Sequence, residues 1–320
     1  MKNNSINILI ASDINYAPYY GVMLTSLFEN NNLSSFVIYL ITDETWTDKE
    51  TRRFEKLCMK HNSSFIVLRT DVFSLIDVPL NPNHHVNKAT YYNILASKIL
   101  PNDIDKVIYM DGDMLVQGDI SSLWDIDMTN YAMAAVWDSI AFDESVAVRL
   151  GYSPEHRYVN NGTSIYNLAY WREHNVDKFL LTFINEHYES LTFMDQDVEN
   201  AVLAGYIKYL PVTYNFQVLF LTKYFSQAFT PEFMNEVLLN KEHPVIIHYN
   251  GGVKPWSWRY YALPYRKEWL RAYWKSPWFF AYKITPIGKY IKHLIKRVVR
   301  RKQLIQAQRN QYIPEAYDLC

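Results

Sequence analysis

The chain has 320 residues, of which 49% are hydrophobic and 20% are charged, so it can bury a large core and is too poor in charge for a disordered chain. Its two cysteines lie far apart, which indicates neither a disulfide framework nor a cysteine metal cluster. The net charge of −1 hides an acidic body, with 17 Lys/Arg and 30 Asp/Glu over residues 1–253, and a basic segment, with 14 Lys/Arg and one acid over 254–302.

The N-terminal third of the chain predicts strands that alternate with helices. Short apolar runs indicate buried strands, and amphipathic spacing indicates the helices. In chain order we expect a strand at 6–11, a helix at 19–31, a strand at 36–43, a helix at 48–62, a strand at 64–71, a helix at 87–101 and a strand at 105–111. This alternation predicts an α/β fold with a largely parallel central sheet. The first apolar run is too short for a secretory signal, and no run of about 18 apolar residues predicts a membrane span.

Two aspartates, Asp111 and Asp113, follow the predicted strand at 105–111. Ligands of open α/β sheets bind at the carboxyl ends of strands, and side chains two apart on a strand point the same way. Two such carboxylates can hold a divalent cation such as Mg²⁺ or Mn²⁺, which also takes phosphate oxygens. Aspartate and glycine are also ordinary turn residues, so a solvated turn is the alternative.

A second polar group, from His248 to Lys254, follows a short apolar run. Histidine is a common third ligand where two acids hold a metal. Gly251 and Gly252 allow the backbone to approach a ligand closely, and Lys254 can meet a phosphate as a point charge. The alternative for His248 is a core histidine beside a turn.

Three further segments carry polar residues that suit a sugar or a nucleotide. Asn160 and Asn161, before Gly162, can donate to and accept from sugar hydroxyls. Asp13 and Asn15 follow the first strand, at the same predicted edge as the aspartate pair. In both segments a plain turn is the alternative.

Acidic residues also begin a predicted helix at 194–203. Helix starts favour acids through the helix dipole, so capping is the alternative to a functional role. The residues concerned are Asp195, Gln196 and Asp197, with Val198, Ala201 and Val202 expected to face inward.

In this order and spacing, the segments "ASDINYA", "YMDGDMLVQGDI", "NNG" followed by "YNLAYWRE", "DQD" and "HYNGGVKPW" resemble glycosyltransferase family 8. This retaining family includes bacterial lipopolysaccharide galactosyl- and glucosyltransferases and glycogenin. The resemblance covers about residues 7–256. It implies a GT-A fold, a nucleotide-sugar-binding domain over 1–256, and leaves 257–320 as an aromatic and basic helical extension.

The resemblance also implies a reaction and its residues. A hexose, galactose or glucose, would move from UDP-galactose or UDP-glucose to a glycan acceptor such as a lipopolysaccharide or lipooligosaccharide core. The implied ligands of Mn²⁺, or Mg²⁺, are Asp111, Asp113 and His248. The implied nucleotide and donor contacts are Ala11, Asp13, Asn15, Asp111, Gly112, Asn160, Gly162, Asp195, Gln196, Gly251 and Lys254, with a looser match at His85. The implied catalytic residues are Gln196, Asp195 and Asp197.

The sequence departs from the family at Asn93. The family usually has arginine in a "TYYR" segment that reaches the donor sugar, whereas this chain reads "TYYN". Asparagine carries no charge and reaches less far, so the change bears on donor choice or catalytic efficiency.

The basic segment at 286–302 has apolar residues at helical spacing, with Lys and Arg between them. It predicts an amphipathic helix on an anionic membrane surface, and hence a peripheral protein on the inner face of the cytoplasmic membrane. Its alternative is a helix packed on the acidic body, and nucleic acid is not expected. Aromatic residues precede it: Trp269, Trp274, Trp278, Phe279 and Phe280.

Two other functions fit parts of the pattern. A haloacid-type phosphatase also has an apolar strand that ends in D-x-D, but there the pair follows the first strand. A non-catalytic, membrane-associated sugar-binding protein would be compatible with Asn93.

Overall fold

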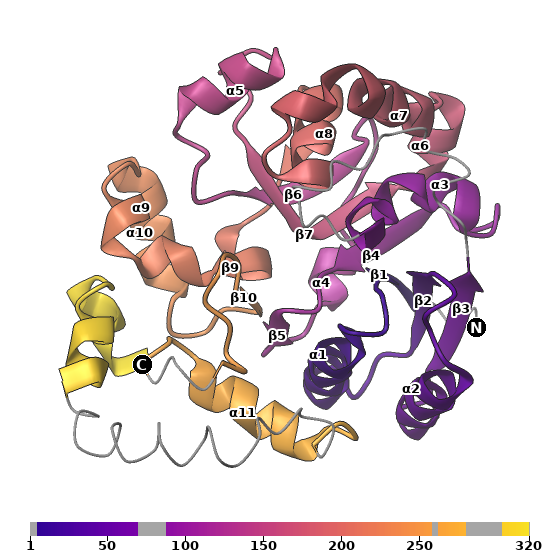
Figure 1. Ribbon diagram of the computed structural model, residues 1–320, viewed down its shortest axis with the longest axis horizontal. Coiled ribbons are helices and arrows are strands. Elements are labelled where there is room, and N and C mark those ends of the chain that lie inside the picture. The colour runs from indigo at the N-terminus through magenta and orange to yellow at the C-terminus, as the bar shows by residue number, and fades with distance from the viewer. Residues whose placement is uncertain (1–4, 70–87, 258–261, 280–302, 320) are drawn as a thin grey trace.

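The structure is a computed structural model that describes residues 5–69, 88–257, 262–279 and 303–319. Within these residues, a seven-stranded sheet in the order β3-β2-β1-β4-β7-β6-β8 forms the centre (Figure 1). Its strands are β1 (Ile6–Ala11), β2 (Phe36–Thr42), β3 (Ser64–Arg69), β4 (Lys106–Met110), β6 (Met133–Trp137), β7 (Val159–Asn167) and β8 (Ile207–Tyr209). Only β7 runs antiparallel to its neighbours, β4 and β6, so the predicted α/β fold with a mostly parallel sheet is confirmed.

Helices cover both faces of this sheet (Figure 1). One face carries α1 (Ala17–Asn30) and α2 (Asp48–Lys60), and the other carries α3 (Ala96–Ile99), α6 (Leu168–Glu173), α7 (Val176–His187) and α8 (Met194–Leu203). Side chains alternate along β1 between two hydrophobic cores: Ile8 and Ile10 enter one, and Leu9 enters the other. Burial on both faces explains why the strands read as continuous apolar runs.

The predicted helix at 87–101 is wrong over most of its length. The chain forms 3₁₀ turns at Lys88–Tyr91 and Asn93–Leu95 before the single turn of α3. Tyr91, Tyr92 and Asn93 are consecutive and all buried, a pattern that one face of a regular α-helix cannot provide. Their distant hydrogen-bond partners override the helical spacing.

A second, small sheet brings distant segments together. In it β10 (Ile246–His248) pairs with β5 (Met114–Val116) on one side and β9 (Phe216–Gln217) on the other. Because β5 begins two residues after Gly112 and His248 lies opposite Met114, the pairing places the end of β10 beside the aspartate pair.

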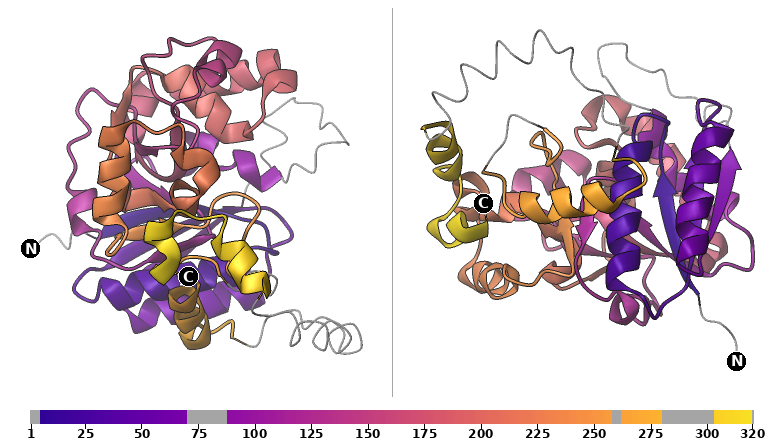
Figure 2. Two further views of the ribbon diagram at one scale, coloured as in Figure 1. Left: turned by 90° about the vertical axis from the view of Figure 1, so that its left-hand side faces the viewer. Right: turned by 90° about the horizontal axis from the view of Figure 1, so that it is seen from below.

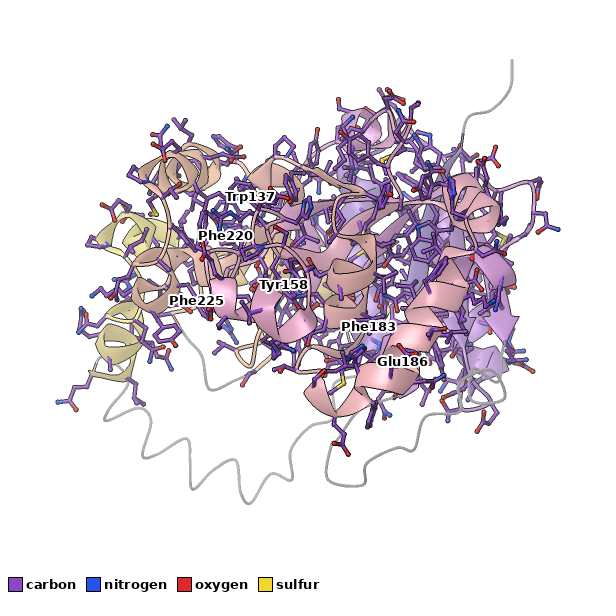
Figure 3. The ribbon with its side chains drawn as sticks, turned by 90° about the horizontal axis from the view of Figure 1, so that it is seen from above. Trp137, Tyr158, Phe183, Glu186, Phe220 and Phe225 are labelled. Carbon is purple, nitrogen blue, oxygen red and sulfur yellow. The ribbon has the colours of Figure 1, made fainter. Side chains whose placement is uncertain are left out.

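Aromatic rings pack where the remaining helices meet the sheet. Trp137 and Phe220, labelled in Figure 3, each lie 5.4 Å from the ring of Phe233, measured between centroids. The helices around the rest of the body are α4 (Ser121–Trp124), α5 (Glu144–Leu150), α9 (Lys223–Ser226) and α10 (Pro231–Asn240).

The described C-terminal residues pack on the body. Helix α11 (Arg266–Lys275) lies beside α1 (Figure 2), and Tyr312 joins the core. Trp269 and Trp278 are 1% and 0% exposed, so the expectation that they accompany a membrane-binding helix is wrong for these two; Trp274 is exposed. The predicted helix at 286–302, Phe280 and His85 lie outside the described residues. In the part of the chain that is described, no helix is both long and apolar enough to cross a membrane.

Candidate active site

Asp111, Asp113 and His248 come together at the carboxyl end of β4. One ligand atom of each lies within 4.8 Å of the others. Nε2 of His248 is 3.3 Å from Asp113 Oδ1 and 3.8 Å from Asp111 Oδ2. Asp111 and Asp113 do not lie on one continuous strand, because the chain turns at Gly112 from β4 to β5. The turn, rather than strand alternation, brings the two carboxylates together.

His248 is oriented by two asparagine oxygens. Its Nδ1 lies 3.0 Å from Oδ1 of Asn160 and 3.0 Å from Oδ1 of Asn215, so Nδ1 carries the hydrogen and donates. Nε2, which faces the two acids, is then the nitrogen that can bind a metal ion. A histidine held through one nitrogen while the other faces carboxylates is the usual arrangement of a metal ligand. The donor set, two carboxylates and one imidazole, fits a divalent cation.

His248 and Asp111 can lie this close to β7 only because residue 162 is glycine. A β-carbon there would lie 2.5 Å from Cε1 of His248 and 2.8 Å from Oδ2 of Asp111. Asn160, Asn161 and Gly162 lie inside β7, so the turn predicted as the alternative for this segment is wrong.

The two aspartates have opposite electrostatic environments. Burial, and then the charge of Asp113, raise the pKa of Asp111 to about 6. Burial acts in the same direction on Asp113, but Lys254 and then His248 hold the pKa of Asp113 well below its usual value. The ammonium of Lys254 contacts Oδ2 of Asp113 and donates to the carbonyl of Tyr249 at 2.9 Å. The two aspartates therefore place negative charge beside the ammonium of Lys254.

Asp197 has structural partners in the first turn of α8. Its carboxylate accepts hydrogen bonds from the Arg149 guanidinium at 2.8 and 3.2 Å, from the Tyr158 hydroxyl at 2.6 Å, and from the backbone N–H groups of Thr192 and Phe193. Burial opposes ionisation, but these donors, Arg149 first, lower the pKa of Asp197. Of the three polar residues that begin α8, it is the one that the capping alternative describes.

Gln196 and Asp195 point instead toward β7. Oε1 of Gln196 accepts from Nδ2 of Asn160 at 3.0 Å, and its Nε2 donates to Asp138 at 3.2 Å. Oδ2 of Asp195 accepts from Nδ2 of Asn161 at 2.6 Å and from Nδ2 of Asn93 at 2.8 Å. Asn93, where we expect a departure from the family pattern, thus binds a predicted site residue directly.

The sequence did not indicate four of the polar residues around this site. Asp138, Asn215 and Gln217 lie in loops, short turns or strand ends without a spacing signal. The fourth, Glu199, is fully buried on α8, whereas Ala201 and Val202, expected to face inward, are only half-buried. A search for charged residues at the spacing i, i+4 from Asp195 would have found Glu199.

The segment after β1 forms an exposed turn at the same sheet edge. Oδ1 of Asp13 accepts from the backbone of Asn15 at 2.9 Å, and Ala11 ends β1. Burial and then the charge of Asp113 raise the pKa of Tyr16, the residue that follows Asn15. Gly251 adopts φ 78°, and the position of Gly112 would bring a β-carbon to 3.0 Å from the ring of Tyr20, so both positions favour glycine.

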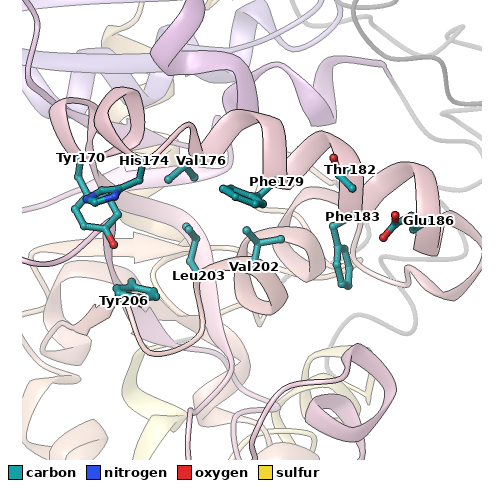
Figure 4. Close-up of a pocket in the computed structure, with 10 residues that line it drawn as sticks. All are labelled: Tyr170, His174, Val176, Phe179, Thr182, Phe183, Glu186, Val202, Leu203 and Tyr206. Atoms are coloured by element: carbon teal, nitrogen blue, oxygen red, sulfur yellow. The ribbon is translucent and has the colours of Figure 1, made fainter.

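A pocket of about 660 Å³ between α7 and the ends of α6 and α8 is separate from these residues (Figure 4). None of the predicted site residues lines it. Its walls are formed by Tyr170, His174, Val176, Phe179, Thr182, Phe183, Glu186, Val202, Leu203 and Tyr206.

Comparisons with known proteins agree on one family. The model of "Glycosyl transferase family 8" matches residues 7–259. General stress protein A of Bacillus subtilis (strain 168) is 30% identical over 84% of this chain and 93% of its own length. Lipopolysaccharide 1,2-glucosyltransferase of Escherichia coli (strain K12) is 28% identical over 85% of this chain and 79% of its own length. Among solved structures, galactosyltransferase LgtC superposes with a TM-score of 0.74 at 20% identity, over 89% of this chain and 99% of that chain, which shows the same fold.

Proposed function

The chain belongs to glycosyl transferase family 8, and we propose that it is a retaining hexosyltransferase that moves galactose or glucose from a UDP-sugar to a glycan. The observation that carries the proposal is the group of Asp111, Asp113 and His248 at the carboxyl end of β4, with Lys254 beside it. Residues 1–256 would form the catalytic domain and 257–320 an extension. The phosphatase alternative is disfavoured because, among the described residues, three strands precede β4, the strand that the aspartate pair follows.

Asp111, Asp113 and His248 would hold the divalent cation, Mn²⁺ or Mg²⁺. When bound, such an ion stabilises the negative charge that develops on the departing diphosphate. Lys254 supplies a second positive charge at the same place, and the turn at Gly251 lets the backbone approach the phosphates. Asp13 and Asn15, on the neighbouring strand end, would contact the uridine.

Asn160, Asp195 and Gln196 would surround the transferred hexose. Retention requires either a covalent intermediate or attack on the face that the leaving group departs from. Gln196 is a neutral amide, which is a poor nucleophile, and the oxygens of Asp197 accept five hydrogen bonds. We therefore favour same-face attack, in which the departing phosphate oxygen accepts the proton of the acceptor hydroxyl. A glycosyl adduct trapped on Asp197 or Gln196 of the unaltered protein would contradict it.

The acceptor that we propose is a lipopolysaccharide or lipooligosaccharide core. The support is the relative from Escherichia coli, which is named for lipopolysaccharide glucosylation. A lipid-linked acceptor suits the basic residues 286–302, which would attach the protein to the anionic inner face of the cytoplasmic membrane.

A panel of nucleotide sugars with Mn²⁺ tests the proposal. We expect hydrolysis of UDP-galactose or UDP-glucose by the unaltered protein, no hydrolysis after chelation with EDTA, and retention of configuration when a glycan acceptor is supplied. A phosphatase would cleave phosphate monoesters and leave the donors intact. Binding of a UDP-sugar without turnover in the presence of Mn²⁺ and an acceptor set would instead support a sugar-binding protein.

A further inference from the structure

A second acid lies buried directly behind Asp195. Glu199 follows Asp195 by four residues on α8, so both side chains project from the same face of the helix. Glu199 is 0% exposed, whereas Asp195 is 8% exposed and forms the outer end of the pair. The mechanism proposed above gives Glu199 no role.

Two asparagines connect the acids. Nδ2 of Asn161 donates to Oδ2 of Asp195 at 2.6 Å and to Oε2 of Glu199 at 3.0 Å. Nδ2 of Asn93 donates to the same oxygen of Asp195 at 2.8 Å and to Oε1 of Glu199 at 3.3 Å. The hydroxyl of Tyr166 donates to Oε1 of Glu199 at 2.8 Å. Each amide nitrogen has two hydrogens. Asn161 can use one for each acid, whereas Asn93 shares its two among Asp195, Glu199 and the hydroxyl oxygen of Tyr166, which lies 3.2 Å away.

The acids determine how the Asn93 amide is turned. Its oxygen, Oδ1, is buried without a hydrogen-bond partner, which costs free energy. If the amide were turned over, its oxygen would face the carboxyl oxygens of Asp195 and Glu199, and these partly negative atoms would repel it. The unpaired oxygen is therefore the consequence of two acids that both require the nitrogen.

Stability alone does not explain Glu199. Burial, and then the charge of Asp195, raise its pKa well above the usual value. Among the described residues, the cations nearest the site pair elsewhere, Arg149 with Asp197 and Lys254 with Asp113, and no ion pair joins a cation to Glu199. A buried acid without a cation opposes folding, and an apolar side chain at this position would avoid that penalty.

We propose that Glu199 is a positioning residue for the donor sugar: it holds Asn93 and Asn161 so that both amides converge on one oxygen of Asp195. The small part of Asp195 that remains exposed would then face the hexose of a UDP-sugar. The inference rests on the proposed function, and it concerns the sugar rather than the nucleotide.

The test compares the affinity of UDP with that of intact donors by titration calorimetry in Mn²⁺. Glu199→Gln retains the size of the side chain, but its amide can accept from only one of the two asparagines. We expect the affinity for UDP-galactose or UDP-glucose, whichever the unaltered protein binds, to fall about 10-fold or more, while the affinity for UDP changes less than about 2-fold. Tyr166→Phe, which removes a single donor to Glu199, provides a milder second variant with the same direction of effect.

Controls separate positioning from a structural role. Leu203→Ala removes a buried side chain from the other end of α8 and should leave the ratio of UDP-sugar to UDP affinity unchanged. Glu199→Gln should weaken donor binding less in an Asn161→Ala background than in the unaltered protein, because part of the effect of the glutamate acts through that asparagine. If Glu199→Gln lowers the affinities for UDP and for the UDP-sugar equally, or lowers neither, the inference is overturned and the proposed function is not affected. Absence of UDP binding by the unaltered protein would overturn both the inference and the proposed function.

Discussion

The imidazole of His248 and the backbone of Gly162 are in such close contact that a β-carbon at Gly162 would lie 2.5 Å from Cε1 of the ring. Strand β7 thereby sets the position of a residue that belongs to the other sheet. The glycine has a steric role in this site, because any side chain would displace the histidine or Asp111.

We predict that Gly162→Ala weakens metal-dependent donor hydrolysis by about 10- to 100-fold, the range measured for residues that orient metal ligands. The displaced imidazole would no longer face both aspartates. Mn²⁺ affinity measured by calorimetry, together with the hydrolysis rate, checks this. Gly252→Ala is the matched control for Mn²⁺ affinity, because a β-carbon there meets no protein atom within 4 Å. Unchanged Mn²⁺ affinity in Gly162→Ala would contradict the steric account.

Asp113→Asn should reduce Mn²⁺-dependent turnover by more than about 100-fold, since loss of a ligand exceeds the effect of loss of an orienting group. The fold should persist, because asparagine has nearly the same shape. The increase in melting temperature on addition of Mn²⁺ should disappear in this variant and remain in Asp125→Asn, a change at an exposed aspartate. Full activity in Asp113→Asn would refute the assignment of this pair to a metal.

Arg149→Ala should lower the free energy of unfolding at pH 7 by about 3 kcal/mol, because it leaves the fully buried Asp197 without its cation. The pKa of Asp197 is lowered in the folded state, so its contribution is present above the unfolded pKa and is lost as the pH falls through the folded value. The difference between the two proteins should therefore shrink below about pH 4. Urea unfolding at several pH values measures it, with the exposed Arg52→Ala as control. A difference that grows toward low pH would be incompatible with this pairing.

Glu199→Gln should make the free energy of unfolding fall less steeply as the pH rises. The pKa of Glu199 is raised by burial and by Asp195, so the folded state binds a proton that the unfolded state releases above about pH 4.5. Stability of the unaltered protein should fall as the pH rises toward the folded pKa, by up to about 1.4 kcal/mol per pH unit for one proton. Thermal unfolding between pH 5 and 8 tests this, with Glu189→Gln at an exposed position as control. Identical slopes in both variants would show that Glu199 is ionised throughout.

Replacing Lys292, Lys296, Arg297 and Arg301 by Gln should reduce binding to vesicles of phosphatidylglycerol and phosphatidylethanolamine by more than about 10-fold, since each basic residue near an anionic surface contributes about 1 kcal/mol. Truncation after Lys283 is a poorer test, because Tyr312 and Ile313 beyond it belong to the core. The same number of changes on α2, at Lys49, Arg52, Lys56 and Lys60, is the control. Equal retention of both variants on vesicles, measured by sedimentation, would argue against membrane attachment through 286–302.

The pattern of apolar residues was sufficient for the fold class, because strand and helix periodicity is a local property and the first three strands pair in parallel as their alternation predicts. The apolar pattern gave a wrong prediction at 87–101, where the chain forms 3₁₀ turns because Tyr92 and Asn93 make tertiary contacts. It failed again at Trp269 and Trp278, because exposure depends on what packs against a side chain.

The same division holds for the site. The order of strand ends and polar residues in the sequence was enough to select Asp111, Asp113, His248 and Lys254, since strand ends in an α/β sheet meet at one edge. Only the tertiary structure decided that His248 presents Nε2, that Asp197 binds Arg149 and Tyr158, and that Glu199 lies behind Asp195. Those facts depend on hydrogen bonds between residues as far as 106 positions apart, whose directions no local spacing encodes.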